Sequence, residues 1–223
     1  MNALVLGGTG LCGSWLLRQA AQSDKIGKVY AITRRELPAE WKTDSVVSIV
    51  DPETSKWGEL VPDDAKILLT GLATTRAAAG GLENQYKVDH DMNIELAKVA
   101  KQKGYRTCVL VSSMGANENS YLPYLKMKGD IERDIIALGF EKTIILRPGG
   151  LLGDRNGRFK GFGDKYFVKL STLFYRTKVQ GVLGYPIYGE EVAKAGLKLA
   201  LDTSNTEKIQ FVSSPELLKL AEK

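Results

Sequence analysis

Short runs of apolar, often β-branched residues alternate along the chain with longer segments in which apolar positions recur every three or four residues. Runs of the first kind predict strands, and they lie at Ala3–Leu6, Val29–Thr33, Val46–Val50, Ile67–Thr70, Thr107–Ser112, Thr143–Leu146 and Ile209–Val212. Segments of the second kind predict helices, among them Leu11–Ala21, Gln85–Lys103 and Leu125–Leu138. Strands that are apolar almost throughout are typical of a parallel sheet covered on both faces, with right-handed crossovers between strands. The pattern therefore predicts an α/β fold built on a doubly wound parallel sheet.

The alternation loosens after Leu146. Residues 149–163 are rich in glycine, and an aromatic and basic segment follows them. Within it, Asp164–Arg176 predicts an amphipathic helix with aromatic and aliphatic residues on one face and basic residues on the other. Because no linker or repeat interrupts the chain, we predict a single domain, residues 1–223, from which residues 149–188 make an excursion.

Composition narrows the class of protein. Of the 223 residues, 43% are hydrophobic and 26% are charged, an ordinary mixture for a globular protein. No apolar run approaches the roughly 18 residues of a membrane-spanning helix, and two cysteines, Cys12 and Cys108, argue against a disulfide scaffold. The single histidine, His90, argues against a histidine-based metal site, and we predict no metal. The sequence opens on a strand without a targeting segment, so we expect the protein on the cytosolic side of membranes.

The formal net charge is +5, and the excess is local. Residues 155–178 contain seven basic side chains and one acidic one, which leaves the rest of the chain close to neutral. Such a patch suits a phosphate group, a nucleic acid or an anionic membrane surface. We expect no nucleic acid, since a basic patch alone does not make a nucleic-acid-binding fold. Two readings of the amphipathic segment stay open: a lid over a pocket, or a helix that lies on an anionic membrane.

The first predicted strand runs into a cluster of glycines before the first predicted helix. Its glycines fit two registers, Gly8-x-Gly10-x-x-Gly13 and Gly7-x-x-Gly10-x-x-Gly13. Glycines in such a turn let backbone amides approach a pyrophosphate, which the N-terminus of the following helix also attracts. Between a strand and a helix, the motif predicts a dinucleotide site, with a purely structural turn as the alternative. The predicted contacts in this turn are Gly7, Thr9, Gly10, Leu11, Cys12 and Gly13.

The end of the second strand bears on the choice of cofactor. NAD sites carry an acidic residue about 20 positions after the glycines, whereas Thr33, Arg34 and Arg35 stand at that place here. Guanidinium groups would hold a ribose 2′-phosphate by charge-assisted hydrogen bonds, which favours NADP(H) over NAD(H). The alternative is an ordinary exposed basic loop.

The next two strand ends extend the predicted cofactor site. Asp51 ends the third strand and has two readings, an acceptor for the adenine amino group or a solvated strand end. Leu72, Ala73 and Thr74 follow the fourth strand. Small residues there let a ligand lie against the backbone at the carboxyl edge, where open α/β sheets bind ligands.

The predicted chemistry lies at the fifth strand and the helix that follows it. The strand ends in Ser112 and Ser113, and Tyr124 and Lys128 follow at the four-residue spacing that shares one helix face. Carbonyl reduction needs a hydride from the cofactor and a proton for the nascent alkoxide. A free tyrosine, with a pKa of about 10, needs positive charge nearby to exchange that proton near neutral pH. The Lys128 ammonium and the oxidised nicotinamide would supply the charge, and Ser113 or Ser112 would polarise the substrate oxygen. The alternatives are serines that satisfy a strand end and a tyrosine with its hydroxyl in water.

In this order, the motifs resemble the short-chain dehydrogenase/reductase superfamily, in its extended or atypical branch. The resemblance rests on the glycine turn, Asp51, the serine pair, Tyr124-x-x-x-Lys128 and Arg147-Pro148-Gly149. More narrowly, residues 72–76 and 88–91 resemble the Tat-interacting-protein-like oxidoreductases, including their fungal members. The resemblance implies an NAD(P)-binding Rossmann fold with Pro148 near the nicotinamide. It also implies that Tyr124 is the acid/base, that Lys128 binds the nicotinamide ribose, and that Ser113 holds the substrate.

The sequence thus predicts an NADP(H)-dependent reductase or dehydrogenase of a small carbonyl or alcohol substrate. The part after Arg147, a small C-terminal substrate lobe, is short for a sugar-nucleotide enzyme. The alternative hypothesis is an NADPH-sensing binding protein at a membrane surface with little or no turnover. The resemblance further implies peripheral association with the outer mitochondrial membrane or the endoplasmic reticulum, and it allows a homodimer.

Overall fold

A seven-stranded sheet forms the centre of the computed structural model, which describes residues 1–153, 175–177 and 180–222. Within these residues the strand order is β3-β2-β1-β4-β5-β6-β9, and every neighbouring pair is parallel. The strands are β1 (Asn2–Leu6), β2 (Val29–Thr33), β3 (Val46–Val50), β4 (Ala65–Thr70), β5 (Thr107–Val111), β6 (Lys142–Arg147) and β9 (Ile209–Ser213). This confirms the predicted doubly wound parallel sheet, with the strand ends within two residues of the predicted ones.

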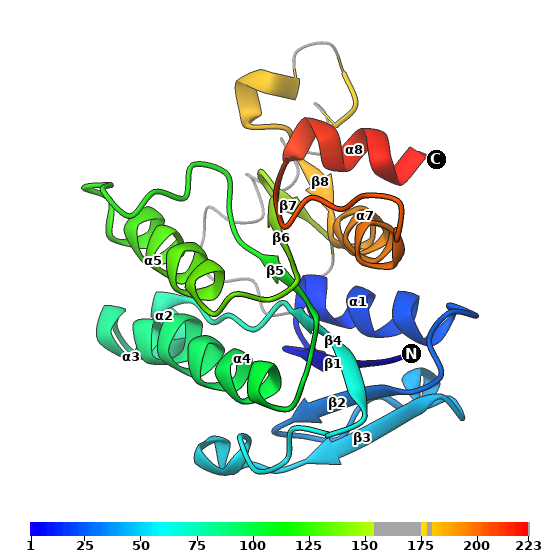
Figure 1. Cartoon of the computed structure of the whole chain (residues 1–223). Coiled ribbons are helices and arrows are strands. Elements are labelled where there is room, and N and C mark those ends of the chain that lie inside the picture. Colours follow the sequence, from blue (N-terminus) through cyan, green and yellow to red (C-terminus); the bar gives the residue numbers. More distant parts are fainter. Residues whose placement is uncertain (154–174, 178–179, 223) are drawn as a thin grey trace.

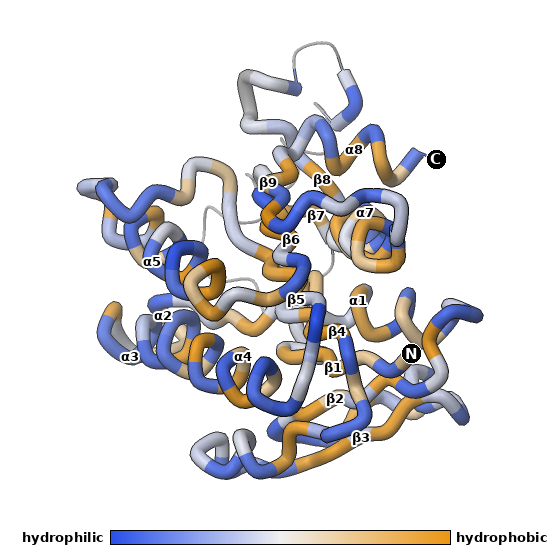
Figure 2. Tube along the Cα trace, viewed as in Figure 1, coloured by the Kyte–Doolittle hydropathy of each residue, from blue (hydrophilic) through white to orange (hydrophobic). Residues whose placement is uncertain are grey.

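Helices cover both faces of the sheet (Figure 1). On one face lie α1 (Leu11–Ala21), α7 (Gly189–Leu201) and α8 (Ser214–Glu222), and on the other lie α4 (Met92–Gln102) and α5 (Pro123–Ala137), preceded by the short α2 (Arg76–Ala79) and α3 (Leu82–Tyr86). Each face has its own cluster of buried apolar side chains. Figure 2 shows the apolar residues gathered in the sheet and on the helix faces turned toward it. The α5 helix begins two residues earlier than predicted because Pro123 is well suited to the first helical position.

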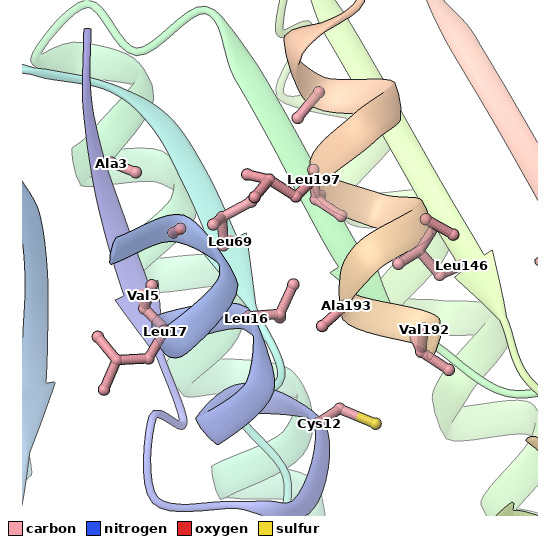
Figure 3. Close-up of a cluster of buried hydrophobic side chains, with 14 of the residues drawn as sticks. Ala3, Val5, Cys12, Leu16, Leu17, Leu69, Leu146, Val192, Ala193 and Leu197 are labelled. Atoms are coloured by element: carbon pink, nitrogen blue, oxygen red, sulfur yellow. The ribbon is translucent and has the colours of Figure 1, made fainter. Parts of the chain in front are cut away.

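The core between α1 and α7 holds the first strand against its neighbours (Figure 3). Leu16 and Leu17 of α1 and Ala193 of α7 are fully buried, above β1 and β4. Gly196 lets α7 approach β6, because a Cβ there would lie 2.7 Å from a methyl carbon of Leu146. This packing fixes the start of α1 over the carboxyl end of β1, between β1 and β4, where the strand order reverses.

The predicted helix Gln85–Lys103 is wrong as a single α-helix. The helical segment begins at Leu82, and a π-helical turn, Lys87–Asp91, separates α3 from α4. Three buried polar side chains, Gln85, Asp89 and Asn93, lie at four-residue spacing across this turn. In a regular α-helix, each four-residue step overshoots a full turn by about 40°. The wider π turn reduces that drift and keeps all three side chains facing the loop after β4.

The excursion is bracketed by a second, two-stranded parallel sheet, β7 (Leu151–Leu152) with β8 (Ile187–Tyr188). A 3₁₀ turn at Gln180–Leu183 precedes β8. Apart from Tyr175 and Arg176, the predicted amphipathic helix Asp164–Arg176 lies outside the described residues. The Arg176 guanidinium donates to carboxylates of α7 and α8, those of Glu191 and Glu222, each at 2.7 Å. No helix in the described part of the chain is long and apolar enough to cross a membrane.

We expect Leu16→Ala to lower the free energy of unfolding by about 2–5 kcal/mol, because Leu16 is completely buried and truncation leaves a cavity between α1, α7 and the sheet. Urea denaturation followed by circular dichroism measures the change. Leu122→Ala is the matched control, since Leu122 is 62% exposed and should change stability by less than about 0.5 kcal/mol. Equal losses for the two variants would contradict the packing described here.

Candidate active site

The turn between β1 and α1 is built on close backbone contacts. Gly7 has φ +74°, and a Cβ there would lie 2.7 Å from the backbone of Gly71. A Cβ at Gly13 would lie 2.0 Å from the carbonyl oxygen of Gly7. At Gly8, by contrast, a Cβ would meet side chains only, at 3.8 Å. Of the two registers open in the sequence, the structure therefore requires glycine in Gly7-x-x-Gly10-x-x-Gly13.

The N-terminus of α1 has the character of an anion site. Its N-cap is Gly10, which has no side chain to accept from the first-turn amides, and the first turn contains no acid. Thr9 and Gly10 are exposed at this end of the helix, and Leu11 is half-buried. Cys12 is 5% exposed and packs in the core beneath the turn, so it can offer a ligand only its backbone. The turn thus fits a pyrophosphate group through exposed amides and the helix dipole.

The ends of β2 and β3 lie side by side next to this turn. Thr33 is buried, and its hydroxyl donates to the carbonyl of Arg35 at 2.8 Å, which turns the chain sharply after β2. Arg34 and Arg35 are exposed on that turn. The amide of Asp51 donates to the carbonyl of Thr33 at 2.9 Å, and one Asp51 carboxylate oxygen accepts from the amide of Glu53 at 2.7 Å. Asp51 therefore shapes its own turn, beside the two arginines.

The loop after β4, residues 71–75, is held by the three buried polar side chains of the interrupted helix. Asp89 accepts from the amide of Thr74 at 2.6 Å, and Gln85 donates to the carbonyl of the same residue at 3.2 Å. Asn93 donates to the carbonyl of Leu72 at 2.9 Å. These bonds fix the backbone of the predicted cofactor contacts Leu72, Ala73 and Thr74 beside the glycine turn.

The two serines at the end of β5 have different partners. Ser112 is buried, and its hydroxyl donates to the carboxylate of Glu132, which also binds the guanidinium of Arg147. Ser113 is half-buried and makes only a long bond, 3.4 Å, to the carbonyl of Met114 among the contacts given by the described residues. The Ser112 hydroxyl is therefore held by a buried carboxylate, whereas the Ser113 hydroxyl is less constrained.

Tyr124 and Lys128 lie together on α5, as the spacing predicts. The Lys128 ammonium nitrogen lies 5.9 Å from the centre of the Tyr124 ring. Tyr124 is 44% exposed, whereas Lys128 is only 4% exposed. A phenol open to a ligand thus stands beside a buried positive charge.

Asp89 is the site residue that the sequence analysis missed. Its second carboxylate oxygen lies 3.3 Å from the Lys128 ammonium, and the side chain is fully buried. The available signal was a polar residue every four positions, Gln85, Asp89 and Asn93, within an otherwise amphipathic segment. Read as one α-helix, those positions drift around the axis, and only the π turn aligns them.

Pro148 lies beside the serine loop. Its carbonyl accepts from the amide of Met114 at 2.8 Å, and the amide of Ser112 donates to the carbonyl of Leu146 at 2.8 Å. The single histidine, His90, bonds Asp91 and Asp134 and stacks on Tyr86. Among residues 1–153, 175–177 and 180–222, no three acidic, histidine or cysteine side chains gather to hold a metal ion.

Comparison with known proteins shows the family of the chain. Residues 3–170 match the NAD dependent epimerase/dehydratase family. The chain belongs to this family. Protein FMP52, mitochondrial, of Kluyveromyces lactis is 76% identical and covers 100% of this chain and 99% of its own length. The Saccharomyces cerevisiae protein of the same name is 55% identical, over 99% of this chain and 96% of the relative. Within the epimerase/dehydratase family, the chain therefore groups with the fungal FMP52 proteins.

Solved structures of the epimerase/dehydratase type share the fold. MoeE5 in complex with UDP-glucose and NAD aligns over 100% of this chain and 81% of its own, with TM-score 0.67 and 18% identity. UDP-glucose 4-epimerase of Thermotoga maritima with UDP-glucose aligns over 100% and 82%, with TM-score 0.68 and 16% identity. These likenesses confirm the Rossmann-type fold. Family membership supports a nicotinamide cofactor and oxidoreductase-type chemistry, and the glycine turn and open α1 N-terminus fit such a cofactor.

We expect Gly13→Ala to abolish tight binding of a reduced nicotinamide cofactor, measured by the cofactor's fluorescence, and to lower the free energy of unfolding by more than about 2 kcal/mol. The reason is the backbone of Gly7, which leaves no room for a methyl group at residue 13. Gly8→Ala is the control, because its methyl group would make ordinary contacts. If Gly13→Ala bound the cofactor as tightly as the wild-type protein, the steric requirement at residue 13 would be wrong, and loss of binding in Gly8→Ala would favour the register that contains Gly8.

Proposed function

We propose that the protein is an NADP(H)-dependent reductase or dehydrogenase of a small carbonyl or alcohol compound, with Tyr124 as acid/base. The observation that carries the proposal is the half-exposed phenol of Tyr124 beside the buried ammonium of Lys128. Both lie on α5, which follows β5 in the chain. The chain leaves β5 at the carboxyl edge of the sheet, and β5 is two strands away from β1. Ligands of doubly wound sheets bind at this edge.

The residues divide the reaction between them. The nicotinamide supplies or accepts the hydride when it is bound. The Tyr124 hydroxyl donates a proton to the oxygen of the reduced carbonyl, and Ser113 donates a hydrogen bond to the same oxygen. The Lys128 ammonium favours the phenolate that remains, because an opposite charge nearby stabilises an anion. The glycine turn would bind the pyrophosphate of the cofactor, and residues 72–74 would contact the cofactor beside it.

The basic turn after β2 favours the phosphorylated cofactor. Arg34 and Arg35 are exposed next to the end of β2, and Thr33 stands where an NAD site has an acid. Guanidinium groups at this place would bind the 2′-phosphate of NADPH with charge-assisted hydrogen bonds. The arginines therefore favour NADPH over NADH as the cofactor.

The size of the chain favours a small substrate. The sugar-nucleotide enzymes that share its fold are longer, since the alignment covers 81% of MoeE5 and 82% of the Thermotoga enzyme. Less protein is then present to enclose a nucleoside diphosphate sugar. We propose a carbonyl compound without a nucleotide moiety.

The predicted associations of the protein rest on other residues. The predicted contact with an anionic membrane through residues 155–178 lies almost wholly outside the described residues, and it stays a prediction, as does the homodimer. The FMP52 relatives carry the word mitochondrial in their names. We propose that the protein associates peripherally with the cytosolic side of the outer mitochondrial membrane or the endoplasmic reticulum.

We expect Tyr124→Phe to lower kcat by about 100-fold or more, because removing a positioned acid/base costs that much. The measurement is loss of NADPH absorbance with a panel of aldehydes, ketones and quinones. Tyr121→Phe is the matched control, since Tyr121 is fully exposed three residues away and should keep wild-type kcat. Equal turnover by the Tyr124 variant would refute the assignment of the acid/base.

We expect the double variant Arg34→Ser/Arg35→Ser to lower the preference for NADPH over NADH by more than about tenfold, as loss of one charge-assisted hydrogen bond would. Dissociation constants for both cofactors give the ratio. Arg106→Ser provides the control, because Arg106 is exposed just before β5, at the edge of the sheet where the amino ends of the strands lie. An unchanged ratio would leave the two arginines as an ordinary basic loop.

A further inference from the structure

Large apolar side chains are exposed in the segment that joins Ser113 to Tyr124. The described residues contain seven exposed large hydrophobic side chains, and four of them, Met114, Tyr121, Leu122 and Tyr124, lie within eleven consecutive positions. The other three are scattered over the N-terminus, β3 and β9. Single exposed apolar residues are ordinary on a protein surface, whereas a cluster marks a place where something apolar binds. Because this cluster lies at the proposed catalytic residues, the substrate is the candidate for what covers it.

The loop that carries the cluster is fixed against α5. The amide of Asn117 donates to the carbonyl of Leu125 at 3.0 Å, in the first turns of the helix. A Cβ at Gly129 would overlap the amide nitrogen of Glu118, so the loop rests directly on the backbone of α5. Leu122 is the N-cap residue of the same helix. The exposed apolar side chains therefore belong to a preformed surface, which lowers the entropic cost of binding a ligand there.

The polar side chains of the loop are engaged by the loop itself and by α5. The Asn117 side-chain oxygen accepts from the amide two residues further on, at 2.9 Å. The Glu118 carboxylate accepts from the guanidinium of Arg133 at 3.0 Å. The Ser120 hydroxyl oxygen accepts from the amide of Leu122 at 3.2 Å. These three polar side chains thus serve the structure of the loop, while its apolar side chains keep exposed surface for a ligand.

Met114 and Leu122 are the apolar side chains next to the reacting groups. Met114 follows Ser113 directly and Leu122 precedes Tyr124 by two residues, so their Cα atoms lie within about 4 Å and 7 Å of those of Ser113 and Tyr124. A Cβ at Gly184 would lie 2.7 Å from the methyl carbon of Met114, so this side chain reaches the turn before β8. A carbonyl compound whose oxygen meets both hydroxyls therefore has its carbon chain beside Met114 and Leu122.

We propose that the substrate is a carbonyl compound with an apolar hydrocarbon chain, an aliphatic aldehyde or ketone, and that Met114 and Leu122 determine this specificity by binding the chain. The inference rests on the proposed function and deepens it, because it names the class of compound that is reduced. The carbonyl carbon gains a hydride from NADPH, the carbonyl oxygen gains the proton of Tyr124, and the products are the alcohol and NADP⁺. Tyr121 is fully exposed and lines no recess, so it has no part in the proposal.

A site of this kind makes affinity depend on chain length. Each methylene group that leaves water on binding favours the complex, by about fourfold where it becomes fully buried. Met114 is 43% exposed and Leu122 is 62% exposed, so they cover one side of a chain, and we expect about twofold per methylene group. A substrate rich in hydroxyl groups would have to place them against these side chains without hydrogen bonds, which costs affinity.

The test is the dependence of turnover on chain length, with NADPH as the cofactor, or NADH if the wild-type protein binds NADH more tightly. The substrates are straight-chain aldehydes from propanal to octanal, and the readout is kcat/KM for octanal divided by kcat/KM for propanal. We expect a ratio of about 30 in the wild-type protein, since octanal has roughly five more methylene groups. Met114→Gln and Leu122→Asn keep the size of the side chain but make it polar, and each should lower the ratio at least about threefold.

Val50→Thr is the matched control, because it makes the same kind of change on a side chain that is 38% exposed at the end of β3, far from β5 in the sheet. It should keep the wild-type ratio. Loss of folded protein or of cofactor affinity does not change the ratio, since two substrates are compared on one protein. A wild-type ratio near 1 would overturn the inference and leave the proposed function standing. A ratio unchanged in both loop variants would overturn the assignment of Met114 and Leu122.

A wild-type protein that binds the cofactor but reduces no carbonyl compound would refute the proposed function, and binding then decides the inference. The probes are the unreactive amides from propanamide to octanamide, titrated by calorimetry into the protein with saturating cofactor. Affinity that rises about twofold per methylene group, and that falls at least about threefold for octanamide in Met114→Gln and Leu122→Asn, would support a site for an apolar chain. Affinity independent of chain length would overturn it.

Discussion

The site depends on one steric constraint, the contact between the backbone of the β1–α1 turn and the backbone at the end of β4. A Cβ at Gly71 would lie 3.0 Å from the amide nitrogen of Gly13, and one at Gly13 would overlap the carbonyl of Gly7. Because these two backbone segments touch without side chains between them, the N-terminus of α1 lies directly beside the loop that follows β4. The cofactor site, the loop held by Asp89 and the lysine behind it all take their places from that contact.

Helix α5 shows how the fold uses buried charge. Three of its charged residues, Lys128, Asp130 and Glu132, are at most 5% exposed. Each has an oppositely charged partner: Asp89 for Lys128, the ammonium of Lys126 for Asp130, and the guanidinium of Arg147 for Glu132. Buried ion pairs are weak evidence for stability, because desolvation offsets much of the attraction. Their effect here is on orientation: they fix the rotation of α5 about its own axis, and this rotation leaves Tyr124 on the exposed side of the helix.

Much of this arrangement was accessible from the sequence, and the exceptions have identifiable causes. The strands were predicted because buried parallel strands are apolar throughout, and Tyr124 with Lys128 because four-residue spacing shares a helix face. The two glycine registers could not be separated from the sequence, because Gly7 and Gly8 are the same residue type. The structure separates them, since only Gly7 lies against the backbone of another segment. Asp89 was missed because the π turn that aligns it has no local signature. The two serines could not be separated, because the partner of Ser112 lies on another element, at Glu132.

The pairing of β6 with β9 has a consequence for how this fold can change. These strands are neighbours in the sheet, in register from Thr143 with Ile209 to Arg147 with Ser213, and the sequence between them spans residues 148–208. Helix α7 lies within this connection and packs in the core, so its place in the connection is fixed. For the segments outside α7, the entropy of loop closure grows only slowly with length, so insertions there cost the fold little. The connection between β6 and β9 can therefore change in length while β1, β4 and α5 keep their places in the fold.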